Sequence, residues 1–354
     1  MKTVLKYVIN VGFIAVSVVI CTLMIMRMKK EREENAIDPL DGFQVFLEGE
    51  EISALYLAKD SLWVGGRDGV KRLDLDSGQV IDYVAEDLEL IYAAEICRWR
   101  DGSVWIGYNE GVTVLTEYGQ LIDFAEPEMT GGRVNTILCV DNGVLVGTME
   151  GVTTFIPSEN GWTVSELRTK ADGLISNVVN VLTETEGELW FGSYLDNRPG
   201  GVSIKRGETW QYVTIEDGLA HPYINAILPL SDSILVATGQ LTAGGLNRLT
   251  KEGDCYIVTD TFNMEDGIPG EKVRWLYKDT AGHLWITTES NGLLVCETEK
   301  IGHPIDGVLL VQKHGLSDNE IKKIVESEKY YWLAGRYGLT RIDKTAIEDC
   351  LGGK

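Results

Sequence analysis

The sequence predicts an all-β fold, a seven-bladed β-propeller built from four-stranded antiparallel blades. Three observations lead to this prediction. A phrase with an apolar anchor, usually tryptophan, recurs seven times at intervals of 40 to 50 residues. A turn of the Asp-Gly-Leu type recurs in phase with it, and each repeat has room for four short strands. Four strands per repeat at this period are the sequence signature of a propeller blade.

The anchors themselves are expected to lie in the blade cores. Their strict period favours packing over a role as sugar-stacking platforms, and leucine in two of the seven positions is a change of packing only. The seven anchors are Trp63, Trp105, Leu145, Trp190, Leu235, Trp285 and Trp332.

The segment 172–193 shows how one repeat is read. Asp172 and Gly173 supply turn chemistry, and the β-branched run that follows predicts the first strand. Glu186 and Gly187 predict a tight turn, after which residues 189–193 form the second strand. A third strand follows the later glycines, and an aromatic segment such as 210–215 completes the blade as its fourth strand.

The two ends of the repeat region complement each other. Residues 43–48 resemble a fourth strand without its first three, whereas the last repeat has three strands and no aromatic fourth. The N-terminal strand is therefore expected to complete the last blade, which closes the ring and removes an open sheet edge.

The repeat pattern in residues 172–190 and 266–285 resembles the bacterial two-component regulator propeller family. The pattern is Gly-Leu or Gly-Ile, then a polar residue, an apolar strand, an acidic turn and Leu-Trp. The resemblance implies a sensor-type seven-bladed propeller of an envelope signalling system, here without a kinase. Such propellers are the extracytoplasmic sensors of membrane-bound histidine kinases.

The N-terminal residues predict a membrane anchor. Residues 7–26 are apolar except for Asn10, and about 20 helical residues span a bilayer core. We expect a transmembrane signal-anchor over 1–30, a charged linker over 31–41 and the propeller over 42–354. A cleaved signal peptide is the alternative for the apolar run. We expect a single-pass protein of the cell membrane with an extracytoplasmic propeller, although the Lys/Arg cluster after the span favours a cytoplasm-facing scaffold.

Charge and cysteine usage restrict the remaining classes. The formal net charge of −22, with no basic stripe, argues against binding of nucleic acid. The six cysteines form no C-x-x-C pair, which argues against a zinc ribbon. Cys97 and Cys139 fall near the ends of first strands in adjacent blades, where two buried thiols are expected in preference to a disulfide.

The sequence predicts no catalytic residues, metal site or cofactor. No metalloprotease, nucleophile-elbow or phosphate-loop motif occurs. Only His221 among the four histidines falls near the expected mouth, next to Pro222, and it is interpreted as a turn residue. The alternative, a lyase- or hydrolase-type propeller enzyme, requires His221 to meet a second acid or base.

A polar rim at one end of the channel is the predicted binding site. First strands begin on this face, and the loops between second and third strands lie on it too. A mixture of Arg, Tyr and Asn suits a polar small ligand, a glycan, a peptide or a protein partner. The candidate rim residues are Arg67, Tyr92, Asn109, Arg133, Asn177, Arg198, Tyr223, Gln240, Lys272, Glu289, Arg336 and Tyr337.

Overall fold

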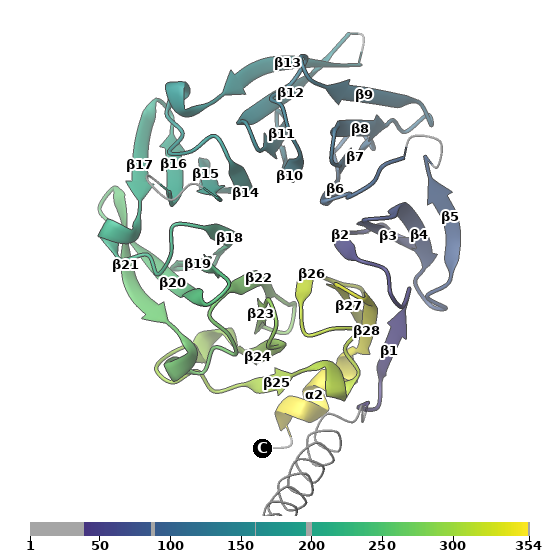
Figure 1. Ribbon diagram of the computed structural model, residues 1–354, viewed down its shortest axis with the longest axis vertical. Helices are drawn as coiled ribbons and strands as arrows, with labels where there is room; N and C mark the ends of the chain where they lie inside the picture. The colour runs from purple at the N-terminus through teal and green to yellow at the C-terminus, as the bar shows by residue number, and fades with distance from the viewer. Residues whose placement is uncertain (1–38, 86–88, 160, 196–199, 353–354) are drawn as a thin grey trace, which may run out of the picture.

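The computed structural model describes residues 39–85, 89–159, 161–195 and 200–352, and these form a ring of seven four-stranded antiparallel sheets (Figure 1). The blades surround a central channel, and in blades 1 to 6 the strands pair in chain order from the channel outward. The all-β, seven-bladed prediction is confirmed.

The strands are regular and short. Blade 1 comprises β2 (Ile52–Leu57), β3 (Ser61–Gly66), β4 (Gly69–Asp74) and β5 (Val80–Val84), and blade 2 comprises β6 (Glu95–Arg98), β7 (Val104–Gly107), β8 (Gly111–Leu115) and β9 (Leu121–Ala125). Blade 3 comprises β10 (Val134–Val140), β11 (Gly143–Thr148), β12 (Val152–Ser158) and β13 (Gly161–Arg168), and blade 4 comprises β14 (Val179–Thr185), β15 (Glu188–Ser193), β16 (Val202–Arg206) and β17 (Thr209–Val213). Blade 5 comprises β18 (Ile224–Pro229), β19 (Ile234–Gln240), β20 (Ala243–Glu252) and β21 (Cys255–Phe262), and blade 6 comprises β22 (Val273–Lys278), β23 (His283–Thr288), β24 (Leu293–Glu297) and β25 (Val308–Leu310).

Blade 7 is completed by the N-terminal strand. It comprises β26 (Ile321–Glu326), β27 (Tyr330–Gly335), β28 (Gly338–Asp343) and, outermost, β1 (Phe43–Phe46). Phe43 lies opposite Ile342, and Phe46 lies opposite Leu339. The predicted three-plus-one closure is confirmed, although the strand ends at residue 46 rather than 48.

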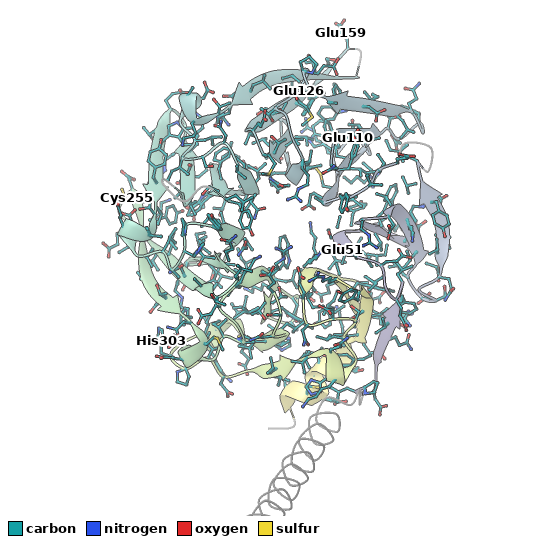
Figure 2. The ribbon with its side chains drawn as sticks, in the orientation of Figure 1. Glu51, Glu110, Glu126, Glu159, Cys255 and His303 are labelled. Carbon is teal, nitrogen blue, oxygen red and sulfur yellow. A yellow bond between two sulfur atoms is a disulfide. The ribbon has the colours of Figure 1, made fainter. Side chains whose placement is uncertain are left out.

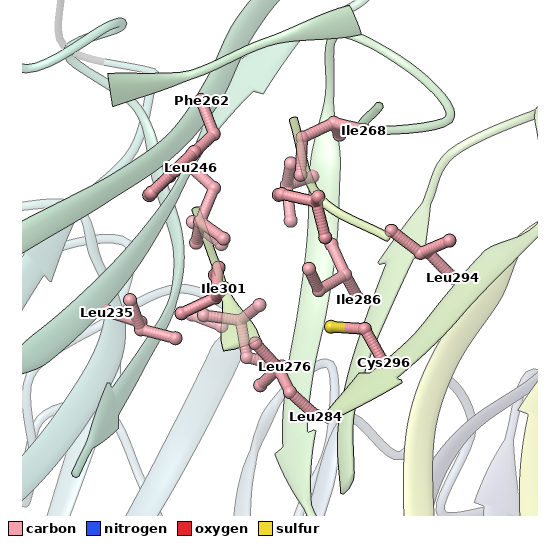
Figure 3. Packing of buried hydrophobic residues seen from close by; sticks show 14 residues of the cluster. Leu235, Leu246, Phe262, Ile268, Leu276, Leu284, Ile286, Leu294, Cys296 and Ile301 are labelled. Atoms are coloured by element: carbon pink, nitrogen blue, oxygen red, sulfur yellow. The ribbon is translucent and has the colours of Figure 1, made fainter. Parts of the chain in front are cut away.

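The repeat anchors pack between the sheets. Trp105, Trp190, Trp285 and Trp332 are fully buried, and the two leucine anchors are buried in the same way. Figure 3 shows the seam between blades 5 and 6, where Leu235 and Leu246 face Ile286 and Leu276. The anchors therefore hold neighbouring blades together, as their period predicts.

The Asp-Gly turns are short capped 3-10 helices. In the first of them, η2 (Lys170–Asp172), the Asp172 carboxylate accepts from the backbone N–H and the hydroxyl of Thr169, both at 2.9 Å. Gly173 follows with φ 105°, a left-handed conformation that glycine adopts without steric cost. The related helices are η3 (Ile215–Asp217), η4 (Met264–Asp266) and η6 (Gln312–His314), while η5 (Thr298–Lys300) lies elsewhere in blade 6.

A C-terminal helix, α2 (Lys344–Gly352), follows β28 and was not expected from the sequence. Its Ile347 is buried in the core that blade 7 shares with blade 6, and Lys344 forms an ion pair with Glu326. None of the helices in the described part of the chain has the length and apolar character that a bilayer crossing requires. The predicted anchor over 1–30 and most of the linker over 31–41 lie outside the described residues.

The cysteine prediction is wrong in one respect. Cys97 on β6 and Cys139 on β10 form a disulfide rather than two thiols. The two strands are the innermost strands of adjacent blades, so side chains at equivalent depths can meet across the seam.

Candidate functional site

The innermost strands of the seven blades enclose a cavity of about 510 Å³. Its wall includes residues from β2, β10, β14, β18, β22 and β26, and from the start of β6. Figure 2 shows Glu51 at the edge of this channel. We call the end where the first strands begin the top face.

One residue in most of these strands bulges toward the channel. The register between first and second strands shifts by one residue in six blades, and a bulge re-aims the side chain that it carries. The bulged residues are Ser53, Asn135, Asn180, Asn225, Arg274 and Lys322.

In blades 3, 4 and 5 the bulged residue is asparagine, and its amide joins one blade to the next. Asn135 Nδ2 donates to the carbonyl of Val179 at 3.0 Å, and Asn180 Nδ2 donates to that of Ile224 at 2.8 Å. Asn225 repeats the contact one blade further on. We call this wall the asparagine side, and its amide groups are used in holding the ring together.

Asn225 uses both N–H groups of its amide in this role. Its Nδ2 donates to the carbonyl of Val273 at 2.8 Å and to that of Gly239 at 3.0 Å. The side chain is 6% exposed. The equivalent carbonyl of Ile321, in blade 7, accepts from Thr287 Oγ1 at 2.8 Å instead, which leaves Arg274 without this structural task.

The opposite wall is charged. Lys322 of blade 7 forms an ion pair with Glu51, at the start of the neighbouring blade 1. Lys323 forms one with Glu95 of blade 2, which is not a neighbour of blade 7 in the ring. Lys323 Nζ also lies 5.1 Å from the centre of the Trp275 ring, within range of a cation–π interaction. We call this wall the charged side.

The charges of this wall extend to the rim. Arg274 Nε lies 3.6 Å from one carboxylate oxygen of Glu320, and Arg336 Nη1 lies 3.8 Å from the other. Burial raises the pKa of Glu51, but the hydrogen bond and charge of Lys322, with the charge of Arg336, outweigh it and leave this pKa below its ordinary value. Glu51 is therefore held as a carboxylate.

The structure exposes half of the predicted rim on the top face. These side chains stand in solvent around the mouth and remain candidates for contact with a ligand. They are Arg67, Tyr92, Asn109, Arg133, Arg336 and Tyr337.

The other candidates are less available. Tyr223 is buried at 4% exposure, and the buried Lys272 forms an ion pair with Glu289 at 2.8 Å. Gln240 is half-buried at the end of β19. Arg198 lies outside the described residues.

Asn177 does not occupy the position assigned to it. Its Oδ1 accepts from the backbone N–H of Lys170 at 2.8 Å, so it caps the adjacent turn. The position that matches Arg133 is one residue later. The carbonyl of Val178 accepts from Tyr194 N just as that of Arg133 accepts from Met149 N, both at 3.2 Å.

His221 lies near the mouth, in a half-buried turn. Its Nδ1 accepts from the backbone N–H of Tyr223 at 3.1 Å, and the two rings meet edge to face. Burial lowers the pKa of His221, which favours the neutral ring. Among the described residues, no charged side chain contributes to this shift, and no group of three His, Cys, Asp or Glu residues is placed to hold a metal ion.

The sequence interpretation missed the residues of the charged side. Arg274, Lys322, Lys323 and Glu95 come two or three residues after the rim position of their blades. A signal was present, because the position occupied by asparagine in three blades carries Arg274 and Lys322 in two others. The predicted rim uses the residue at the start of each first strand and the loops between second and third strands, and it does not include this position within the strand.

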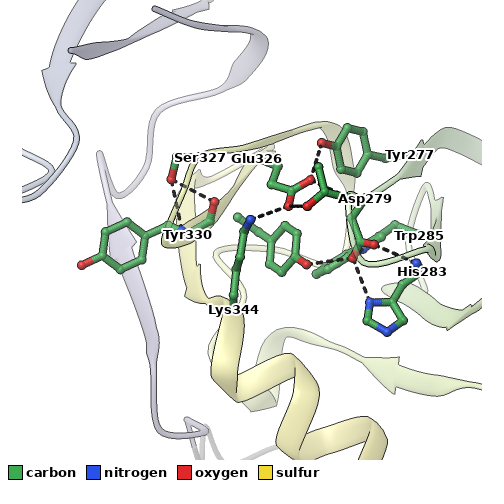
Figure 4. Close-up of polar contacts among 10 residues, drawn as sticks. Tyr277, Asp279, His283, Trp285, Glu326, Ser327, Tyr330 and Lys344 are labelled. Atoms are coloured by element: carbon green, nitrogen blue, oxygen red, sulfur yellow. Dashed lines mark hydrogen bonds and ion pairs between the residues drawn. The ribbon is translucent and has the colours of Figure 1, made fainter. Parts of the chain in front are cut away.

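The sequence also does not predict a second polar cluster, which lies at the other end of the ring. The buried Asp279 accepts from Trp285 Nε1 at 3.0 Å and from the Tyr331 hydroxyl at 2.8 Å (Figure 4). His283 adds its backbone N–H at 2.7 Å. These donors outweigh burial and keep the pKa of Asp279 below its ordinary value. The cluster joins blades 6 and 7.

Comparisons with known proteins agree with this architecture. Residues 267–290, in blade 6, match the family model described as two component regulator propeller. No curated protein sequence matches the chain. The extracellular domain of a hybrid two component system from B. thetaiotaomicron has a TM-score of 0.71 at 18% identity, covering 88% of this chain and 42% of that one. The extracellular domain of a one component system from the same organism gives 0.65 at 18% identity, covering 86% and 40%.

Virginiamycin B lyase from Staphylococcus aureus is also similar, with a TM-score of 0.62 at 14% identity, covering 85% of this chain and 98% of that one. At these identities the likeness shows the fold. The chain spans less than half the length of the two component and one component proteins that it matches.

The fold and the channel thus define a seven-bladed β-propeller with a polar, partly charged central cavity. Its sixth blade carries the sequence repeat of the two component regulator propeller family, which confirms the resemblance seen in residues 266–285.

Proposed function

We propose that this chain is a membrane-tethered, extracytoplasmic binding module of a two-component-type envelope signalling system. It binds a polar ligand (a glycan or a peptide) or a protein partner at the top face of the propeller. The observation that carries the proposal is a 510 Å³ cavity whose lining includes exposed Tyr92 and Arg133, with the charges of Arg67 and Arg336 close to its Glu51. Cavities of this size with a few convergent polar groups are typical binding sites.

Three further observations support the placement outside the cytoplasm. The family repeat is that of two component regulators, and two of the similar solved structures are described as extracellular domains. The disulfide between Cys97 and Cys139 fits an oxidising compartment.

The net charge of −22 disfavours nucleic acid as a partner.

A binding role has more support than an enzymatic one. The likeness to virginiamycin B lyase extends to the fold, whereas His221 has a backbone N–H and an aromatic ring as its described partners. His221 Nδ1 is therefore occupied by a backbone N–H, and no carboxylate among the described residues orients the ring for proton transfer. We therefore propose that the chain is not an enzyme.

Topology is tested by labelling single cysteines at Arg67 or Tyr337, in a background without the native cysteines, with a membrane-impermeant maleimide. We expect labelling on intact cells. Labelling only after lysis would contradict an extracytoplasmic propeller and would favour a cytoplasm-facing scaffold.

Binding at the top face is tested on glycan and peptide arrays with the full chain. The Arg133→Ala/Tyr337→Ala variant should lose the signals that the unmodified chain gives. The control is Lys329→Ala, an exposed residue outside the cavity wall and rim that pairs with Asp76. Equal loss in both variants, or in neither, would count against a site at this mouth.

A further inference from the structure

The cavity carries an excess of positive charge in an acidic protein. Four of its lining side chains are cationic and two are anionic, so the formal excess is four minus two, or +2, against −22 for the whole chain. Adding the rim pair of Glu320 and Arg336 changes both counts by one and leaves the excess the same. The cations are Arg133, Arg274, Lys322 and Lys323, and the anions are Glu51 and Glu95.

The cations are concentrated and shielded on the charged side. Lys322 and Lys323 are successive residues of β26, with side chains 8% and 12% exposed, and Arg274 projects from the neighbouring β22. These three cations share the wall with Glu51 and Glu95, so the charged side has an excess of three minus two, or +1. Low-dielectric walls focus the field of such an excess and raise the local concentration of counter-ions. The guanidinium of Arg274 adds a planar fork that matches an oxyanion.

We propose that the channel binds a small oxyanionic ligand, whose carboxylate, phosphate or sulfate group is held by Arg274, Lys322 and Lys323. The cavity volume of about 510 Å³ fits a small molecule and excludes a folded partner. The inference deepens the proposed function, since the ligand enters through the same mouth. It also gives the module its ligand class.

The test is calorimetric titration of the detergent-solubilised full chain with malonate, phosphate and sulfate. We expect binding that weakens with added NaCl, because a salt screens partly exposed charges. The anion that binds tightest identifies the group, malonate indicating a carboxylate ligand and the other two a phosphorylated or sulfated one.

The informative variant is Lys323→Met/Glu95→Gln, which removes the ion pair without leaving Glu95 unpaired in the wall. Loss of one charge-assisted contact should weaken anion binding about tenfold or more. Lys323→Arg keeps the charge and should keep binding within about threefold. The matched control, Lys71→Met/Glu50→Gln, removes a pair of similar burial outside the cavity wall and should bind as the unmodified chain does.

Three results would overturn the inference: no binding of any of the three anions, equal affinity in the Lys323→Met/Glu95→Gln variant and its control, or equal weakening in both. The melting temperature of each variant, measured first, shows that it is folded. The maleimide result is independent of these titrations. A propeller found inside the cell would contradict the proposed location but not the anion site. A failed titration would contradict the anion site but not the proposed location.

Discussion

The asparagine side and the charged side of the channel are built from the same position of the repeat. On the asparagine side, Asn135, Asn180 and Asn225 each donate to a backbone carbonyl of the next blade. On the charged side the same position holds Arg274 and Lys322, whose side chains face carboxylates instead. Where this repeat position holds the same residue in successive blades, the side chain stabilises the ring. Where it holds a different residue, the side chain becomes available for binding.

The comparison assumes that both sides rest on equivalent blade cores. Trp190→Ala, in blade 4, and Trp332→Ala, in blade 7, should each lower the free energy of unfolding by about 3–5 kcal/mol, because each leaves a cavity in place of a fully buried indole. Urea denaturation measures both. An unchanged melting temperature for either would contradict the assignment of the anchors to the core.

The asparagine side should be sensitive at the bulged position. Asn225→Ala removes two hydrogen bonds and leaves the carbonyls of Val273 and Gly239 without this donor. The expected loss of stability is about 2–3 kcal/mol. Arg274→Ala, at the same repeat position on the charged side, should cost about 1 kcal/mol or less, as for a partly exposed ion pair. Equal costs in urea denaturation would remove the distinction between the sides.

A substitution of Thr287 tests why Arg274 does not donate a hydrogen bond to the next blade. Its hydroxyl donates to the carbonyl of Ile321, which asparagine would otherwise serve. Thr287→Val keeps the shape and should cost about 1 kcal/mol. Adding Arg274→Asn to this variant should restore part of the loss. A second substitution that only destabilises further would show that the two positions are not interchangeable.

The smallest effect concerns pH. The pKa of Glu51 lies below its ordinary value of 4.5, so its carboxylate stabilises the fold above pH 4.5, and this contribution is lost as the pH falls through the lowered pKa. The Lys322→Met/Glu51→Gln variant lacks this titration. The difference in unfolding free energy between the two proteins should therefore shrink below pH 4.5. An unperturbed Glu side chain titrates between pH 6 and pH 3. A difference in unfolding free energy that stays constant over this range would contradict the ion pair.

The sequence predicts most of this fold because a repeat reports the same local choice seven times. The buried tryptophans, the capped Asp-Gly turns and the closure by residues 43–46 all follow from period and turn chemistry. Helix α2 could not be found in this way, since it occurs once and lies outside the repeat.

The candidate site was predicted less well, for a physical reason. The rim positions depend on a register that a single residue can shift, as Asn177 shows by capping a turn one residue before the ring position. The pairing of Lys322 with Glu51 and the disulfide between Cys97 and Cys139 join residues of different blades. Contacts of this kind depend on the closed ring, which no single repeat encodes.

We expect an anion to bind on the charged side of the channel and not on the asparagine side. The most direct measurement is an anomalous difference map from crystals of the full chain soaked in selenate, an oxyanion with a strong anomalous signal. We predict a peak in the channel within hydrogen-bonding range of Arg274, Lys322 or Lys323. A channel without a peak, or a peak beside Asn135, Asn180 or Asn225 alone, would contradict an anion site on the charged side.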